Sequence, residues 1–175
     1  MIEASKYLQL ISYDNRKGLF CQNKNWGESM KKYSRLVNYY ETDQMGIVHH
    51  SNYIRYFEEA RLYWMDEIGL SYSGLEKRGL IIPVTFADCQ YKQPVHFGDM
   101  ICILVRIVKF DGLKMEFAYE VRDETTGELR STGRTGHCFL DRDMHPVLIR
   151  KSAPELYDIM LNALHEDGGA GRKGM

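Results

Sequence analysis

The chain has 175 residues with a hydrophobic fraction of 44%, which predicts one domain with a core of its own. The 23 basic residues nearly cancel the 24 acidic ones, so net charge gives no reason to expect nucleic acid as a partner. The four cysteines include no C-x-x-C pair, and no apolar run reaches the roughly 18 residues of a membrane helix. We therefore expect a reduced, cytoplasmic protein without a zinc knuckle, a disulfide framework or a membrane span.

Residues 1–30 show no sustained hydrophobic period and are interrupted by asparagine and glycine. We expect a weakly ordered extension there, or a chain whose translation truly starts at Met30. The tail, residues 166–175, is rich in glycine and predicts disorder. The expected folded domain therefore covers residues 31–165.

The first convincing strand lies in KKYSRLVNYY, residues 31–40, and a short polar loop follows it. After the loop, apolar residues from Tyr53 to Ile68 recur at steps of four, three, four and four, which predicts one amphipathic helix over about 52–68. Ser51 or Asn52 is the expected N-cap, because a short side-chain oxygen can accept from free helical N–H groups. A second, shorter helix is expected over 71–78.

The second half of the chain predicts an antiparallel meander. Strands are expected at 80–94, 100–110, 113–122 and 129–140. Pro83 and Pro94 bracket the first of these, which suggests an edge strand, and Asp111-Gly112 is a strong hairpin signal.

Two further features complete the expected fold. Gly133 and Gly136 inside the last strand indicate a bulge or a close approach of another backbone. Ser152 and Glu155 have the spacing of a capping box that opens a terminal helix. The predicted class is α+β, with one long central helix wrapped by a curled antiparallel sheet.

The segment YETDQMGIVHHSNY, residues 40–53, resembles the signature of the hotdog-fold acyl-CoA thioesterases. The resemblance is to the 4-hydroxybenzoyl-CoA thioesterase and its relative in the Tol-Pal cluster. The continuation YFEEAR, residues 56–61, also looks like that family. The order of strand, helix and meander extends the likeness from about Lys31 to Leu164.

The resemblance implies a thioester hydrolase with the hotdog fold, with a homodimer or homotetramer and active sites at subunit interfaces. The family's catalytic aspartate falls on Asp43, which can activate water or attack the thioester itself. The residue whose backbone N–H polarises the thioester carbonyl falls on His50, at the start of the long helix. Histidine at this position favours the Tol-Pal type, which prefers short acyl chains or acyl groups on carrier protein.

Further residues are expected to contact an acyl-CoA or acyl-carrier-protein substrate: Gly46, Val48, Tyr53 and Lys114. Lys109, Arg130 and Arg134 are additional candidates for the phosphates of coenzyme A. We expect no cofactor. We also expect no metal, because His49 and His50 are consecutive rather than one helical turn apart.

Two alternatives to an acyl-CoA thioesterase remain open. One is a thioesterase whose true donor is acyl carrier protein. The other is a non-catalytic protein that binds acyl-CoA without turnover. A hotdog dehydratase is less favoured, because those enzymes depend on a different arrangement of histidine and acid.

Overall fold

A computed structural model describes residues 30–168, 170 and 171, so the expected extension before residue 30 lies outside the described residues. The elements follow one another along the chain in this order: β1 (Lys31–Leu36), the 3-10 turn η1 (Tyr39–Glu41), α2 (Asn52–Glu67), α3 (Tyr72–Lys77), β2 (Val84–Tyr91), β3 (Met100–Phe110), β4 (Lys114–Asp123), β5 (Leu129–Cys138), α4 (Ile149–Ser152), α5 (Pro154–Glu166) and β6 (Ala170–Gly171). No helix in this part of the chain is both long and apolar enough to cross a bilayer.

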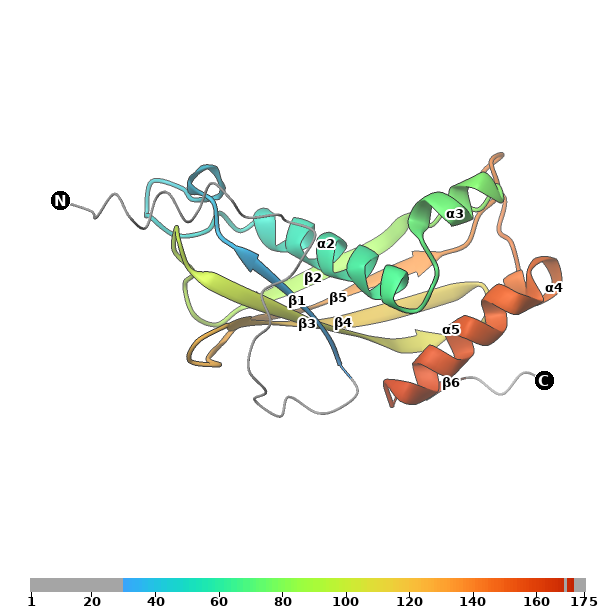
Figure 1. Cartoon of the computed structure of the whole chain (residues 1–175). Coiled ribbons are helices and arrows are strands. Elements are labelled where there is room, and N and C mark those ends of the chain that lie inside the picture. Colours follow the sequence, from blue (N-terminus) through green and yellow to red (C-terminus); the bar gives the residue numbers. More distant parts are fainter. Residues whose placement is uncertain (1–29, 169, 172–175) are drawn as a thin grey trace.

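Five strands form a curled antiparallel sheet in the spatial order β1-β3-β4-β5-β2 (Figure 1). The expected α+β class with a curled antiparallel sheet is confirmed. The strand β2 lies at an edge, beyond β5, as its flanking prolines indicated. A short parallel pairing of β6 with β3 extends the ordered part of the chain beyond residue 165, into the expected disordered tail.

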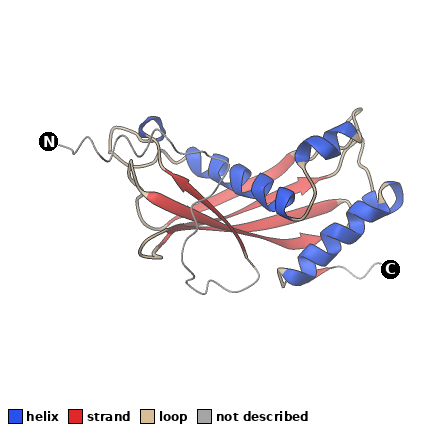
Figure 2. Cartoon of the chain, in the orientation of Figure 1, coloured by secondary structure: helices blue, strands red, loops and turns tan. Residues whose placement is uncertain are grey.

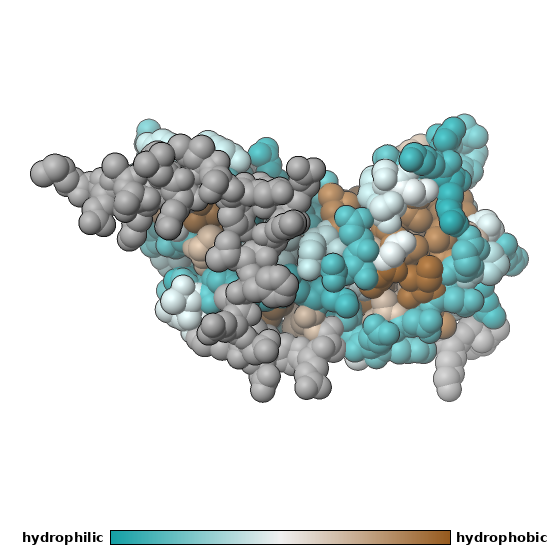
Figure 3. Space-filling view, viewed as in Figure 1, coloured by the Kyte–Doolittle hydropathy of each residue, from teal (hydrophilic) through white to brown (hydrophobic). Residues whose placement is uncertain are grey.

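Two helices, α2 and α5, pack on the same face of this sheet, and no described helix lies on the opposite face (Figure 2). The expectation of one central helix is therefore incomplete. The ring of Trp64 on α2 meets Phe117 of β4 edge to face, with ring centroids 5.0 Å apart. Leu156 and Met160 of α5 belong to the same buried cluster. Hydrophobic residues reach the surface between α3 and α5 (Figure 3).

The period-2 pattern of β4 separates the two faces of the sheet. Its alternate residues Met115, Phe117, Tyr119 and Val121 are buried toward the helices, as the sequence predicts. The residues between them point to the opposite face. The hairpin before β4 uses Gly112 at φ +87°, a conformation that favours glycine.

Gly133 on β5 permits the close approach that the sequence suggested. A Cβ atom at this position would lie 2.3 Å from Cε2 of Phe57 on α2 and 2.6 Å from the Asp88 carbonyl oxygen. Any larger side chain would therefore push α2 away from the sheet.

Two local expectations are wrong. The strand β1 ends at Leu36, and Tyr39–Glu41 turn as a 3-10 helix because Glu41 binds inward. The capping box at Ser152 is absent: Ser152 is the last residue of α4, and the N-cap of α5 is Ala153 without a side-chain cap. Pro154 does occupy the first turn of α5, where its missing N–H is harmless.

Candidate active site

A tight turn after η1 carries Asp43. The Asp43 N–H donates to the Ile47 carbonyl at 2.9 Å, and one carboxylate oxygen of Asp43 accepts from the Met45 N–H at 2.8 Å. Gly46 closes the turn at φ +74°, a backbone conformation that favours glycine. One carboxylate oxygen thus holds the turn, and the other has no partner among the described residues.

A buried charge cluster beneath this turn ties it to the sheet. The Arg35 guanidinium on β1 binds Glu41 at 2.5 Å and Glu59 of α2 at 2.6 Å. The same guanidinium lies 4.2 Å from the ring centroid of Tyr56. Because Arg35 and Glu41 are 7% and 5% exposed, this charge pair is shielded from water and strongly directional.

The backbone of Glu41 connects the cluster to the start of α2. Its carbonyl oxygen accepts from the His49 N–H at 2.8 Å and from the side-chain amide of Asn52 at 2.7 Å. The cluster therefore fixes both the strand side and the helix side of the Asp43 loop.

The N-terminus of α2 lies at the end of this loop. Ser51 is the N-cap residue, as predicted, but its hydroxyl binds Nδ1 of His49 at 2.8 Å instead of a helical N–H. The backbone N–H of His50 has no acceptor among the described residues, whereas its carbonyl oxygen accepts from the Tyr91 hydroxyl at 3.1 Å. An N–H group is therefore available at the positive end of the helix dipole.

A pocket of about 460 Å³ brings these parts together. It is lined by Asp43, Met45, Ile47, Val48, His50, Tyr53, Tyr91, Lys92, Gln93 and Pro94. Most of these side chains are apolar, so a carboxylate and a helix N-terminus face a hollow that would accept an apolar group.

Aromatic rings form the inner wall of this pocket. Tyr53 is 3% exposed, and its ring meets Tyr91 edge to face at 5.1 Å. Burial, together with the neighbouring Cys89 and Tyr91, raises the pKa of Tyr53 to about 12. The Tyr53 hydroxyl is therefore neutral at ordinary pH and cannot act as a base.

Four of the six residues expected to form the site line this pocket: Asp43, Val48, His50 and Tyr53. Gly46 shapes the turn without lining the pocket. Lys114 lies elsewhere, on β4 opposite Cys138, so the structure does not bring it to the site. The prediction missed the segment 91–94, which begins at the last residue of β2 and also lines the pocket. Pro94 indicated that a strand ends there, but nothing in the sequence pattern showed that this segment contacts residues 43–53.

One group of described side chains, Asp141, Asp143 and His145, has the spacing of possible cation ligands. It lies on the exposed loop after β5. One oxygen of Asp141 already accepts from the backbone N–H groups of Asp143 and His145, as expected for a turn. The pocket itself contains no comparable group.

Comparison with known proteins finds several relatives that are described as thioesterases or esterases. A family model described as the thioesterase-like superfamily matches residues 37–159. The putative acyl-CoA thioesterase YneP of Bacillus subtilis is 34% identical over 120 residues, which span 68% of this chain and 86% of that protein. A putative esterase of Aquifex aeolicus is 37% identical over 108 residues, or 62% and 83% of the two chains. The solved DHNA-CoA thioesterase from Staphylococcus aureus superposes with a TM-score of 0.74 at 30% identity, covering 81% of this chain and 96% of that one.

Proposed function

The chain belongs to the thioesterase-like superfamily, and from this premise we propose that it is an acyl-CoA thioesterase. It hydrolyses a thioester to a carboxylic acid and a thiol. One observation carries the proposal: the Asp43 carboxylate and the N-terminus of α2 line the same largely apolar pocket. Relatives named as thioesterases support thioester hydrolysis in general.

In the proposed reaction, the thioester carbonyl lies between Asp43 and the His50 N–H. The carboxylate of Asp43 takes a proton from a water molecule, whose oxygen attacks the carbonyl carbon. Negative charge develops on the carbonyl oxygen, which accepts from the His50 N–H at the helix terminus. Collapse of this intermediate breaks the C–S bond, and the departing sulfur receives the proton. Direct attack by Asp43, through an anhydride, remains the alternative.

The imidazole of His50 has a secondary place in this proposal. Its ring is tilted by 36° against that of His49, with the centroids 4.0 Å apart, next to the positive end of α2. In the proposed reaction this ring would orient the attacking water, whereas Asp43 takes its proton. Histidine at position 50 is also the basis for proposing a Tol-Pal-type enzyme over a hydroxybenzoyl type.

A second copy of the chain is the proposed partner. The edge strand β2 exposes Val84 and Phe86, 54% and 41% accessible, beside an unpaired row of backbone groups. Pairing of two β2 strands would bury this edge and bring the partner to the pocket, since Tyr91 ends β2 and lines it. We therefore propose a homodimer with a continuous sheet. The expected homotetramer stays a prediction. The cytoplasmic location also stays a prediction.

The first test replaces Asp43 with asparagine, which keeps the size and the hydrogen bond to the turn but removes the base. Turnover of an acyl-CoA panel, measured with a thiol reagent, should fall by roughly 10²- to 10⁴-fold. Asp66→Asn on the exposed side of α2 is the matched control and should keep full activity. Undiminished turnover in Asp43→Asn would refute the catalytic role.

Thiol release and thermal melts separate this proposal from its two alternatives, a carrier-protein thioesterase and a non-catalytic acyl-CoA-binding protein. If acyl carrier protein is the true donor, one acyl group should be released faster from carrier protein than from coenzyme A. If the protein only binds acyl-CoA, the ligand should raise the melting temperature of the wild type without thiol release. The second result would remove the hydrolase proposal altogether.

A further inference from the structure

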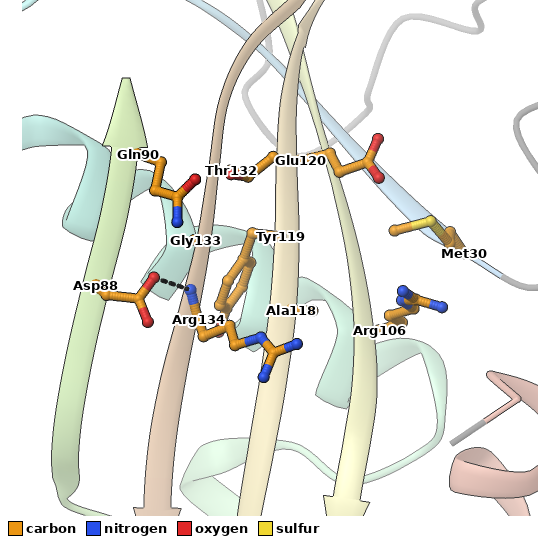
Figure 4. Close-up of a pocket in the computed structure, with 10 residues that line it drawn as sticks. All are labelled: Met30, Asp88, Gln90, Arg106, Ala118, Tyr119, Glu120, Thr132, Gly133 and Arg134. Carbon is orange, nitrogen blue, oxygen red and sulfur yellow. Dashed lines mark hydrogen bonds between the residues drawn. The ribbon is translucent and has the colours of Figure 1, made fainter. Parts of the chain in front are cut away.

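A second hollow lies on the face of the sheet that α2 and α5 leave uncovered (Figure 4). Its volume is about 490 Å³, similar to that of the first pocket. Residues of four neighbouring strands line it, and Met30 lies at one end: Met30, Asp88, Gln90, Arg106, Ala118, Tyr119, Glu120, Thr132, Gly133 and Arg134. It contains none of the residues of the Asp43 pocket.

Strand register places two arginines in one row across this hollow. Arg106 on β3 pairs in register with Ala118 on β4, and Ala118 pairs with Arg134 on β5. In Figure 4 the two arginines lie on either side of Ala118, with α2 behind the sheet. The small alanine between them leaves room over β4 for a ligand that touches both guanidinium groups.

The two arginines differ from their basic neighbours in having no carboxylate partner. On the same sheet, Arg130 binds Asp123 at 2.9 Å and Lys109 binds Glu116 at 2.9 Å. Neither Arg106 nor Arg134 forms an ion pair with any residue in 30–168. Because only Ala118 separates the two arginines in this row, an anion bound over that residue would be attracted by both positive charges.

The acids in this hollow already have partners. Glu120 binds the Arg122 guanidinium at 2.7 Å, and Asp88 accepts from the Arg134 backbone N–H at 3.2 Å. Neutral donors lie in the next row of the sheet, because Glu120 pairs in register with Thr132 and Thr132 with Gln90. The hollow thus offers two free cations, a hydroxyl and an amide within one small area.

We propose that this hollow binds a phosphate monoester, with Arg106 and Arg134 holding the phosphate from two sides. Guanidinium groups match phosphate oxygens through paired, charge-assisted hydrogen bonds. Thr132 and Gln90 take the hydroxyl groups of the attached molecule. The ligand is either the nucleotide end of coenzyme A, which rests on the proposed function, or a free phosphate compound, which does not.

The test is isothermal titration calorimetry of the full chain with two probes, adenosine 3′,5′-bisphosphate and inorganic phosphate. The wild type should bind at least one of them, and unphosphorylated adenosine should not bind. Binding of the bisphosphate alone identifies a nucleotide ligand, and binding of both identifies phosphate itself. The double variant Arg106→Gln, Arg134→Gln should lose roughly tenfold or more in affinity, because it removes both charged donors to the phosphate.

Two control variants separate binding in this hollow from a general effect of positive charge and from binding in the Asp43 pocket. Arg150→Gln removes an exposed arginine on α4 and should leave binding unchanged. Lys92→Gln removes the cation of the Asp43 pocket together with its 3.1 Å bond to Gln90, so it should lower the affinity much less than the double variant does. Loss of affinity in Lys92→Gln but not in the double variant would overturn the proposal, as would a wild type that binds neither probe. Circular dichroism of each variant establishes that it is folded before titration.

Discussion

The two ends of α2 differ in how their polar groups are satisfied, although both belong to one continuous helix. At the N-terminal end, hydrogen bonds and a buried ion pair hold the loop of the exposed His50, whose backbone N–H has no acceptor within the described part of the chain. At the C-terminal end, the Trp64 ring is fully buried and its Nε1–H donates to Asp167 at 3.1 Å. The first end leaves polar groups available, whereas the second satisfies them.

This difference indicates that the C-terminal end of α2 serves stability, whereas the N-terminal end serves the proposed chemistry. The same oxygen of Asp167 also accepts from the Ile107 N–H at 2.9 Å, which joins α2, α5 and β3 in one buried junction. Burial raises the pKa of Asp167 despite these bonds. A change at this junction should alter the free energy of unfolding, whereas a change near Asp43 should alter turnover.

The largest effect is expected at the N-terminal end, where Arg35→Met would leave the buried Glu41 carboxylate without its cation. Removing one partner of a buried pair costs about 3–5 kcal/mol. Because Glu41 also holds His49 and Asn52, turnover of the molecules that remain folded should fall as well. Urea unfolding and kcat/KM at low temperature measure the two effects. Arg78→Met breaks an exposed pair with Glu155 and should change little.

The next effect tests the C-terminal end through Asp167→Ala. The substitution orphans the N–H groups of Trp64 and Ile107, at a total cost of about 3 kcal/mol in unfolding free energy. Asp167→Asn keeps an oxygen in place and should cost much less. Turnover per folded molecule should stay at the wild-type level in both variants. A loss of kcat without unfolding would show that the two ends are coupled.

A smaller, pH-dependent effect is expected from His137 on the buried face of β5. Burial and the positive charge of Arg61 lower the pKa of His137 to about 3. Below pH 6.5 the unfolded chain binds a proton at this residue and the folded chain does not. The unfolding free energy should therefore decrease as the pH is lowered from 6 to 4, by about 1.4 kcal/mol per pH unit. His137→Gln should lack this part of the slope in urea titrations.

The smallest effect is expected for Ser51→Ala. A helix N-cap that loses its side-chain bond typically costs about 1 kcal/mol. The Ser51 hydroxyl binds His49 instead of the helix, so the cost should be below about 0.5 kcal/mol. A thermal melt measures this change in stability. The pH profile of turnover tests separately whether the loss of the Ser51 hydroxyl changes the orientation of His49. A loss of 1 kcal/mol or more would mean that Ser51 caps the helix after all.

Local patterns predicted most of the elements because their causes lie in neighbouring residues. The hairpin at Gly112, for example, follows from a backbone conformation that favours glycine. The inward turn after Leu36 was missed because it depends on Glu41 meeting Arg35 across the fold. The pocket was half predicted for the same reason: Asp43 and Tyr53 lie in one motif, whereas residues 91–94 reach them only through the tertiary structure.

The place of β2 at the edge has a consequence for synthesis of the chain. This strand leaves the ribosome before its sheet neighbour β5, to which Val84 pairs through His137, more than fifty residues later. Until β5 emerges, the strands already made can pair only as β1 with β3 and β3 with β4. Nascent chains that stop within this interval therefore present a loose hydrophobic strand, which is the kind of segment that chaperones hold and that drives misassembly.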